Sequence, residues 1–207
     1  MKCIKPYFLI VLVLMFGSCA VEQSSPEPSS EARIADSLVT LFQRELEREQ
    51  ISDFEREIFT RAVETGRIDP ADYEEAHLRY DRCMRDAGFP LTYSKRSSGV
   101  YSTDTWIGES AELLGDQGLI CSRGVLARVE ALFNLQQNNP DLLVDDREVA
   151  VRCLAKAGLV PSSYAVEDFQ RDFIDWGADS EGPPFDPMDP VANDCLAGAG
   201  YEYWRDY

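Results

Sequence analysis

The chain has 207 residues, of which 37 are Asp or Glu and 20 are Lys or Arg, and its formal net charge at pH 7 is −17. A chain this negative repels nucleic-acid phosphates and anionic lipid head groups, which excludes DNA, RNA and adsorption to an acidic membrane surface. Cationic or neutral partners and metal ions are compatible with the charge. The length suits one domain that buries about two-thirds of its surface.

The first residues have the pattern of a secretory signal peptide. Lys2 and Lys5 form a short basic start, and residues 7–16 are an uncharged apolar run. As a helix this run would be about 15 Å long, half of the ~30 Å hydrocarbon core, so it is too short for a stable membrane span. Small residues follow at its end, as signal cleavage requires.

The end of the run, FGSC at residues 16–19, resembles a bacterial lipobox, in which small residues precede a cysteine. The resemblance implies cleavage after Ser18 and attachment of a diacylglycerol thioether, with acyl chains such as palmitate, to Cys19. Residues 1–18 would then be a lipoprotein signal peptide, and two or more acyl chains anchor a protein stably to the cell membrane. The first position of the motif holds Phe where Leu is usual, and ordinary cleavage after Ala20 is the alternative.

Residues 19–33 are rich in Ser, Pro and Glu and hold few apolar residues. A segment of this composition cannot bury enough apolar surface to fold, so we expect a disordered tether that holds the domain off the bilayer. The folded, exported domain would then span residues 34–207 and face outside the cytoplasm.

Apolar residues at helical spacing and helix-capping signals dominate residues 34–207. Ser52 and Glu55 form a capping box, and Asp69-Pro70 gives an N-cap followed by proline at the first helical position. Residues 89–105 are expected to form a long loop. Few stretches alternate as a strand would, so the predicted fold class is all-α. The expected helices cover residues 34–49, 52–63, 70–83, 121–137, 145–153 and 169–176, with a last one that begins at Asp189-Pro190.

A short signature occurs three times, as CMRDAGF at residues 83–89, CLAKAGL at 153–159 and CLAGAGY at 195–201. Its spacing fits a Schellman motif at the C-terminal end of a helix, with the glycine in left-handed backbone. The residue after each glycine would then contact the residue after each cysteine. No base is spaced to activate a thiolate, so these cysteines are predicted to be structural.

An even number of cysteines remains in the exported domain, which indicates two disulfides. The segments between neighbouring cysteines have similar lengths, and each begins with a capped helix that ends in the signature. We therefore favour pairing of neighbours, which would give a small multi-helix domain stapled into two loosely repeated halves. Crossed and nested pairings remain open. The favoured pairs are Cys83 with Cys121 and Cys153 with Cys195.

A zinc site is not expected, because no CxxC spacing is present.

The run YEEAHLRYDRCMRDAGFP, preceded by TGRIDPA, resembles a segment common in uncharacterised secreted lipoproteins of Gram-positive bacteria. The match extends over residues 64–90, and the cysteine ends at Cys153 and Cys195 are similar to it. The resemblance implies a bacterial cell-surface lipoprotein. It brings no activity that could be transferred.

Few residues of the sequence indicate a catalytic or ligand-binding role. His77 lies within the third expected helix, and no nucleophile or phosphate-binding motif accompanies it, so we expect a solvent-facing or hydrogen-bonded histidine.

The C-terminal run YEYWRDY is expected to complete the core. If exposed, it would offer Tyr201, Tyr203 and Trp204 for binding glycans or peptides. A loop-rich stretch could hold Ca²⁺, but its irregular spacing favours solvated charges and helix caps. Its acidic residues are Asp175, Asp179, Glu181, Asp186, Asp189 and Asp194.

The sequence therefore predicts a lipid-anchored cell-envelope protein that acts as a non-catalytic binding or interaction module. Its partners would be the membrane, through the lipid, and an envelope protein or glycan, and no cofactor or metal is expected. The alternative is a carboxylate-based hydrolase of envelope polymers. Such an enzyme would show two carboxyl groups about 5–10 Å apart in one cleft, one of them with a pKa raised by burial.

Overall fold

The structure, a computed structural model, describes residues 32–103, 111–177 and 181–201. All of them belong to one compact unit, Glu31–Tyr207. Cys19 and the predicted signal peptide lie outside the described residues. Residues 32–34 already pair with a later segment: Ile34 N donates to Leu142 O at 2.8 Å, and Arg33, which the sequence analysis assigned to the tether, bridges to Leu143.

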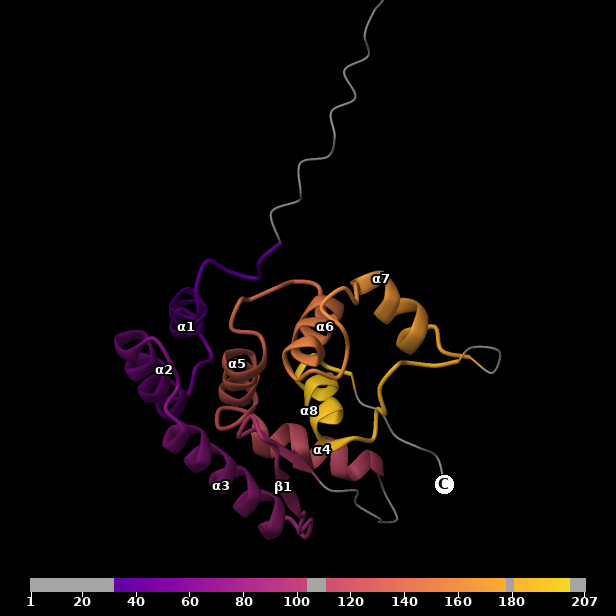
Figure 1. The fold of residues 1–207 in the computed structure, drawn as a ribbon. Coiled ribbons are helices and arrows are strands. Elements are labelled where there is room, and N and C mark those ends of the chain that lie inside the picture. Colours follow the sequence, from indigo (N-terminus) through magenta and orange to yellow (C-terminus); the bar gives the residue numbers. More distant parts are fainter. Residues whose placement is uncertain (1–31, 104–110, 178–180, 202–207) are drawn as a thin grey trace, which may run out of the picture. The chain divides into compact units, whose positions relative to one another are not determined.

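The first half of the domain is built around α5, which contacts three earlier helices and also the last one. Figure 1 shows α5 between the α1–α2 pair and the helices of the second half. Its buried Phe133 packs into a core with Phe42, Ile58 and Tyr73. The helices of this half are α1 (Leu38–Leu46), α2 (Asp53–Thr65), α3 (Pro70–Asp86), α4 (Ala111–Ser122) and α5 (Ala127–Asn138).

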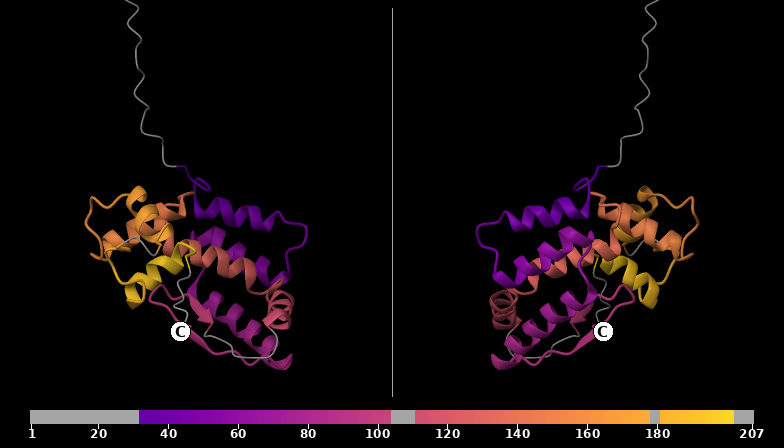
Figure 2. Two further views of the ribbon diagram at one scale, coloured as in Figure 1. Left: turned by 90° about the vertical axis from the view of Figure 1, so that its right-hand side faces the viewer. Right: turned by 90° about the vertical axis from the view of Figure 1, so that its left-hand side faces the viewer.

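The second half has its own core, which includes Leu154, Phe169, Phe185 and Leu196. In this half α6 contacts both α7 and α8, and α8 contacts α5 of the first half. The side views in Figure 2 show the two halves next to each other along this contact. The helices are α6 (Asp146–Lys156), α7 (Val166–Phe169), its π-helical continuation η1 (Gln170–Ile174) and α8 (Pro190–Gly198).

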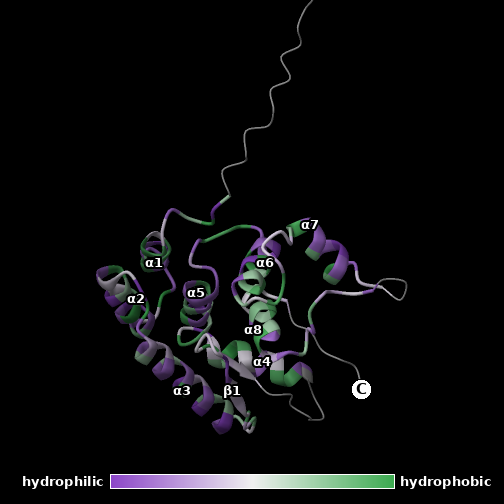
Figure 3. Ribbon diagram, viewed as in Figure 1, coloured by the Kyte–Doolittle hydropathy of each residue, from purple (hydrophilic) through white to green (hydrophobic). Residues whose placement is uncertain are grey.

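Hydropathy differs between helices according to their position. Figure 3 shows α8 as largely hydrophobic and α3 as largely hydrophilic. In α8, Ala192, Cys195 and Leu196 are buried in the second core, whereas α3 turns one face to solvent. The apolar face of α3 is therefore narrow, and the residues on it decide what this helix packs against.

The helix starts predicted from the capping motifs at Ser52, Asp69 and Asp189 are confirmed. Ser52 Oγ accepts a hydrogen bond from Glu55 N at 3.0 Å, and the Glu55 carboxylate accepts one from Ser52 N at 3.2 Å, which is a complete capping box. Asp69 and Asp189 each cap a helix that has proline in its first turn. Asp145 caps α6 as well, by accepting from the backbone of the helix.

The three signatures end three helices as predicted. Gly88, Gly158 and Gly200 have φ of 88°, 74° and 86°, where a side chain would be strained. The residue after each glycine donates its backbone N–H to the carbonyl five positions earlier, the six-to-one bond of a Schellman motif. These bonds join Phe89 to Met84 at 2.8 Å, Leu159 to Leu154 at 3.0 Å and Tyr201 to Leu196 at 2.8 Å.

The domain is all-α with two disulfides, and both favoured pairings are confirmed. Cys83–Cys121 joins α3 to α4, and Cys153–Cys195 joins α6 to α8. Each bridge therefore stays within one half and closes it. By the chain-entropy argument, loops of this length stabilise the folded state by roughly 4 kcal/mol each.

The prediction of a loop over residues 89–105 is wrong in the middle of this range. Two short antiparallel strands, β1 (Tyr93–Lys95) and β2 (Tyr101–Thr103), form a hairpin there. Its turn closes through Arg96 N to Val100 O and Gly99 N to Arg96 O, both at 2.9 Å, with Gly99 at φ 84°. The strands are too short to show an alternating pattern.

The expected helix over residues 121–137 is confirmed from Ala127 onward, as α5, but its start is wrong, because α4 ends at Ser122 and α5 begins at Ala127. Gly124 lies between them at φ 73°, and its carbonyl oxygen accepts a hydrogen bond from Ser52 Oγ at 2.6 Å. The cap of α2 thus also fixes the bend between α4 and α5. The first helix is also shorter than expected, because Ser37 caps it by accepting from Thr40 N.

Candidate functional site

A stripe of aromatic residues follows the inner face of α3. Tyr73, His77 and Tyr80 are four and three residues apart, a spacing that places them on one side of a helix. Tyr73 is fully buried, and its ring stacks on Phe133 of α5 with centroids 4.2 Å apart. The stripe is therefore anchored in the first core at its N-terminal end.

The hairpin adds two more tyrosines to this stripe. The ring of Tyr101 stacks on His77, with centroids 3.9 Å apart and planes 25° apart. Tyr93 meets the same imidazole edge-on at 4.4 Å. The backbone N–H of Tyr101 donates to Tyr73 Oη at 3.0 Å, which fixes the hairpin to α3. On its outer side Tyr101 Oη donates to Glu74 at 2.6 Å.

His77 is buried, with 6% of its surface exposed, so the expectation of a solvent-facing histidine is wrong. Its ring makes no hydrogen bond to another residue within the described part of the chain, and ring contacts hold it instead. Burial lowers its pKa from 6.5, although Asp81 and Glu74 act in the opposite direction. The imidazole is therefore neutral at neutral pH.

Glu130 of α5 reaches this aromatic cluster from the other side. Its Oε2 accepts a hydrogen bond from Tyr73 Oη at 3.1 Å. Burial raises the pKa of Glu130, and the bond from Tyr73 only partly offsets that increase. Glu130 makes no ion pair with any other residue in the ranges that the structure describes. Its charge therefore has a hydrogen-bond donor, Tyr73, but no cationic partner within those ranges.

Two hollows meet at Glu130, and we call them together the cleft. The aromatic hollow, of about 330 Å³, is lined by rings of α3 and the hairpin and by the glycines of α4. The arginine hollow, of about 300 Å³, lies toward α8. Tyr101, Ala127 and Glu130 belong to both linings. The aromatic hollow adds His77, Tyr80, Tyr93, Gly115 and Gly118, and the arginine hollow adds Arg96, Ser102, Asn134 and Gly198.

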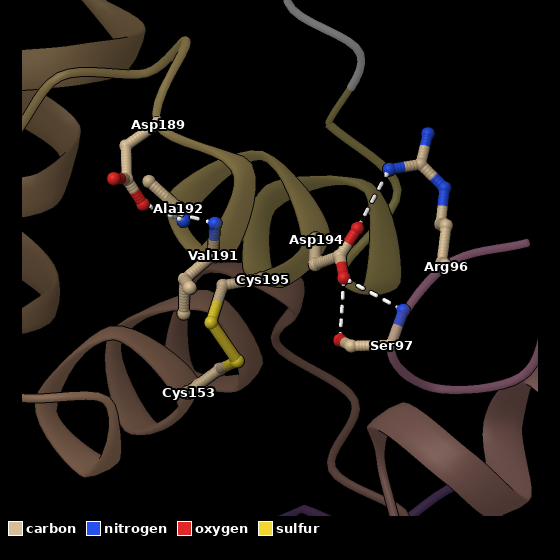
Figure 4. Close-up of a disulfide and its surroundings, with 8 residues drawn as sticks. All are labelled: Arg96, Ser97, Cys153, Asp189, Val191, Ala192, Asp194 and Cys195. Atoms are coloured by element: carbon tan, nitrogen blue, oxygen red, sulfur yellow. Dashed lines mark hydrogen bonds and ion pairs between the residues drawn. A yellow bond between two sulfur atoms is a disulfide. The ribbon is translucent and has the colours of Figure 1, made fainter.

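A polar clamp holds the far side of the cleft, where the hairpin turn meets α8. Asp194 accepts from Arg96 Nη1 at 3.3 Å and from Ser97 N at 2.9 Å, and Ser97 Oγ also donates to it (Figure 4). Arg96 donates further to Asn193 at 3.0 Å and to Ser102 at 3.2 Å. The guanidinium is thus already occupied by groups of the protein.

The remaining candidate binding residues lie apart from the cleft. Tyr201 is half-buried and packs on Phe169 and Phe173 of the second core, with centroids 5.3 and 6.0 Å apart. Tyr203 and Trp204 lie outside the described residues. The burial expected for the C-terminal run therefore holds for Tyr201, the part that the structure describes.

Three acidic residues of the 175–194 stretch are engaged by groups of the protein. Asp186 accepts from Met188 N at 2.9 Å, Asp189 caps α8, and Asp194 belongs to the clamp. Within the described ranges, no group of three or more His, Cys, Asp or Glu side chains could hold a metal ion. Asp179 lies outside those ranges.

Sequence reasoning missed the cleft itself. Its central residues, Tyr93, Tyr101 and Glu130, come from segments that only the tertiary fold brings together. The spacing of Tyr73, His77 and Tyr80 was the one local signal, since it places three aromatic side chains on one face of a helix.

The fold is an all-α, disulfide-bonded domain that carries a tyrosine-lined cleft. No protein-family model matches the chain, and neither does any curated protein or solved structure. Within the described ranges, no helix combines the length and the apolar character that crossing a membrane requires.

Proposed function

We propose that this protein is a cell-envelope lipoprotein, anchored to the cell membrane through Cys19 and facing outside the cytoplasm. The basic start, the short apolar run and the cysteine that follows it support this proposal. The two disulfides support it as well, because disulfides form and persist in oxidising compartments.

We further propose that the folded domain is a non-catalytic binding module and that the cleft is its binding site. The observation that carries this proposal is the meeting of the two hollows at Tyr101, Ala127 and Glu130. Ligand sites in proteins are concave, rich in aromatic side chains and equipped with a few polar groups that orient the ligand. The cleft has these properties, and the clamp and the ring contacts hold its walls in place.

The same geometry favours binding over hydrolysis of envelope polymers. A carboxylate-based glycosidase needs two carboxyl groups that face each other across the scissile bond. Glu130 is the one acidic side chain among the described residues that line the two hollows. Glu74, which contacts the hairpin, is engaged by Tyr101 and Lys95.

The proposal is tested with the chain that begins at Ala20, which contains every described residue, both cores and both disulfides. Wild type and two variants are immobilised and exposed to protein and glycan fractions of an envelope extract. Ala127→Trp places a bulky ring at an exposed position shared by both hollows, whereas Ala71→Trp makes the same change at an exposed first-turn position of α3.

We expect the wild type and Ala71→Trp to retain the same ligand and Ala127→Trp to lose it, as read by mass spectrometry. Equal retention by Ala127→Trp would show that binding occurs elsewhere. Turnover of a glycan or peptidoglycan by the wild type, abolished in Glu130→Gln, would replace the binding module by the hydrolase.

A further inference from the structure

We propose that the aromatic hollow binds an organic ammonium group and that Glu130 holds it. This inference rests on the proposed binding function and gives the ligand a chemical class. It depends on three properties of the hollow: a carboxyl group without a cationic partner, aromatic walls and the absence of a competing positive charge among its described lining residues.

The carboxyl group of Glu130 is the first of these properties. One oxygen, Oε2, accepts from Tyr73, and the other, Oε1, makes no hydrogen bond to a residue in the described ranges. The side chain lines both hollows, so a ligand in either of them can reach it. An ammonium N–H that donates to Oε1 would form a charge-assisted hydrogen bond, which is stronger than a neutral one.

The walls of the hollow supply aromatic rings around that carboxyl group. Tyr80 and Tyr93 line the aromatic hollow beside His77 and Tyr101. The faces of tyrosine rings attract cations electrostatically, and clusters of such rings recognise substituted ammonium groups. Tyr93 Oη is buried and has no hydrogen-bond partner within the described part of the chain.

The cations near the cleft do not neutralise Glu130. His77 is neutral at neutral pH because burial lowers its pKa. Arg96 lines only the arginine hollow and is held by Asn193 and Asp194. The net charge of −17 adds a long-range attraction for positively charged ligands.

The binding should depend on pH through Glu130. The groups that face it are Tyr73 and Tyr80 from α3 and Tyr93 and Tyr101 from the hairpin, with His77 and Arg96 in the two linings. The tyrosines stay neutral below pH 10, because burial or a neighbouring carboxylate raises their pKa values. Burial also raises the pKa of Glu130, so affinity for a cation falls as the pH drops through that raised value.

The test compares two probes of nearly the same shape, benzylamine and benzyl alcohol, by NMR titration of the chain that begins at Ala20. Benzylamine carries an ammonium group at neutral pH, whereas benzyl alcohol is neutral. We expect the ammonium to bind about tenfold more tightly, in the range of one charge-assisted hydrogen bond. Amide signals of the aromatic hollow should report the binding.

Two variants show which residues cause the preference. Glu130→Gln should abolish the difference between the probes, and Glu64→Gln, an exposed change on α2, should preserve it. Should Glu130→Gln fail to fold, Tyr93→Leu removes one ring from the wall and should weaken benzylamine binding several-fold.

Equal affinity of the two probes, or an unchanged preference in Glu130→Gln, would overturn the ammonium inference and leave the cleft as a binding site for neutral ligands. No benzylamine-induced shift in the hollow would also overturn it. The proposed function fails separately, when Ala127→Trp retains the envelope ligand as well as the wild type does.

Discussion

Glu55 is fully buried, and its carboxylate has one cationic partner, Arg128 of α5, at 2.9 Å. The same carboxylate completes the capping box of α2. Ser52 of that box donates to Gly124 between α4 and α5. These few residues therefore connect three helices around one buried charge.

Removing the guanidinium should be costly, because it would leave the Glu55 charge buried without a cation. We expect Arg128→Met to lower the free energy of unfolding by about 3 kcal/mol or more. The control Arg61→Met removes an exposed ion pair with Asp72 and should change the free energy of unfolding by less than about 1 kcal/mol. Denaturant unfolding measures the free energy for both variants. If the two substitutions destabilised the domain equally, the importance assigned to the buried pair would be contradicted.

His77 is the one histidine of the sequence, so its ring signals in an NMR spectrum are unambiguous. Burial lowers its pKa from 6.5 in the folded state. The unfolded chain then binds the extra proton first, so this contribution to stability is complete above about pH 6.5 and is lost as the pH falls. We expect a titration midpoint below 6.5 in the native domain and near 6.5 in urea. A native midpoint above 6.5 would contradict the buried, ring-packed position.

At the scale of elements, replacing two glycines by alanine should change the stability of the domain in opposite directions, although both glycines have open space around them. Gly158 ends α6 at φ 74°, and Gly115 lies inside α4, and a Cβ would meet nothing within 4 Å at either position. We expect Gly158→Ala to destabilise the domain by about 1–2 kcal/mol, the cost of left-handed backbone. Gly115→Ala should stabilise it by roughly 0.5–1 kcal/mol, because alanine favours a helix. Thermal unfolding would contradict this account if both changes had the same sign.

The elements that could be predicted from sequence depend on residues within one turn. Ser52 with Glu55, Asp69 with Pro70, and the signature ending in Gly88 each carry a complete local rule for a helix end. The disulfide pairing was favoured by the similar lengths of the two segments between neighbouring cysteines, although crossed and nested pairings stayed open. A motif confined to one helical turn can be recognised without knowing the rest of the fold.

The elements that could not be predicted depend on distant contacts. The hairpin strands have three residues each, too few for a pattern, and α3 holds them through Tyr73 and His77. The bend at Gly124 depends on Ser52, 72 positions away in the sequence. Glu130 is one of 37 acidic residues, and nothing local distinguishes it from the others. The candidate site therefore became visible only in the folded structure.

At the scale of the whole molecule, the anchoring proposal makes a prediction about the mature N-terminus. We expect mass spectrometry of the purified protein to find Cys19 as the first residue with a diacylglycerol thioether attached. Cys19→Ala should release the protein from the membrane into the medium, because the anchor is lost. An unmodified N-terminus at Val21 in the wild type would contradict lipidation.

The two halves each have a core and a disulfide, and the cleft lies where the hairpin and α5 of the first half approach α8 of the second. Gly198 makes this approach possible, since a Cβ there would lie 2.7 Å from the Asn138 side chain. The arrangement places Glu130 and Tyr101 at the centre of the hollowed surface, and the central claim is that this surface binds the ligand.

The most direct test of that claim is a ¹H–¹⁵N NMR spectrum of the chain that begins at Ala20, recorded before and after addition of an envelope extract. The account predicts that the shifted amide signals concentrate on residues that line the two hollows, among them His77, Tyr101 and Glu130, and that Ala127→Trp abolishes these shifts. Shifts confined to α6 and α7, with the signals of the cleft unchanged, would contradict it.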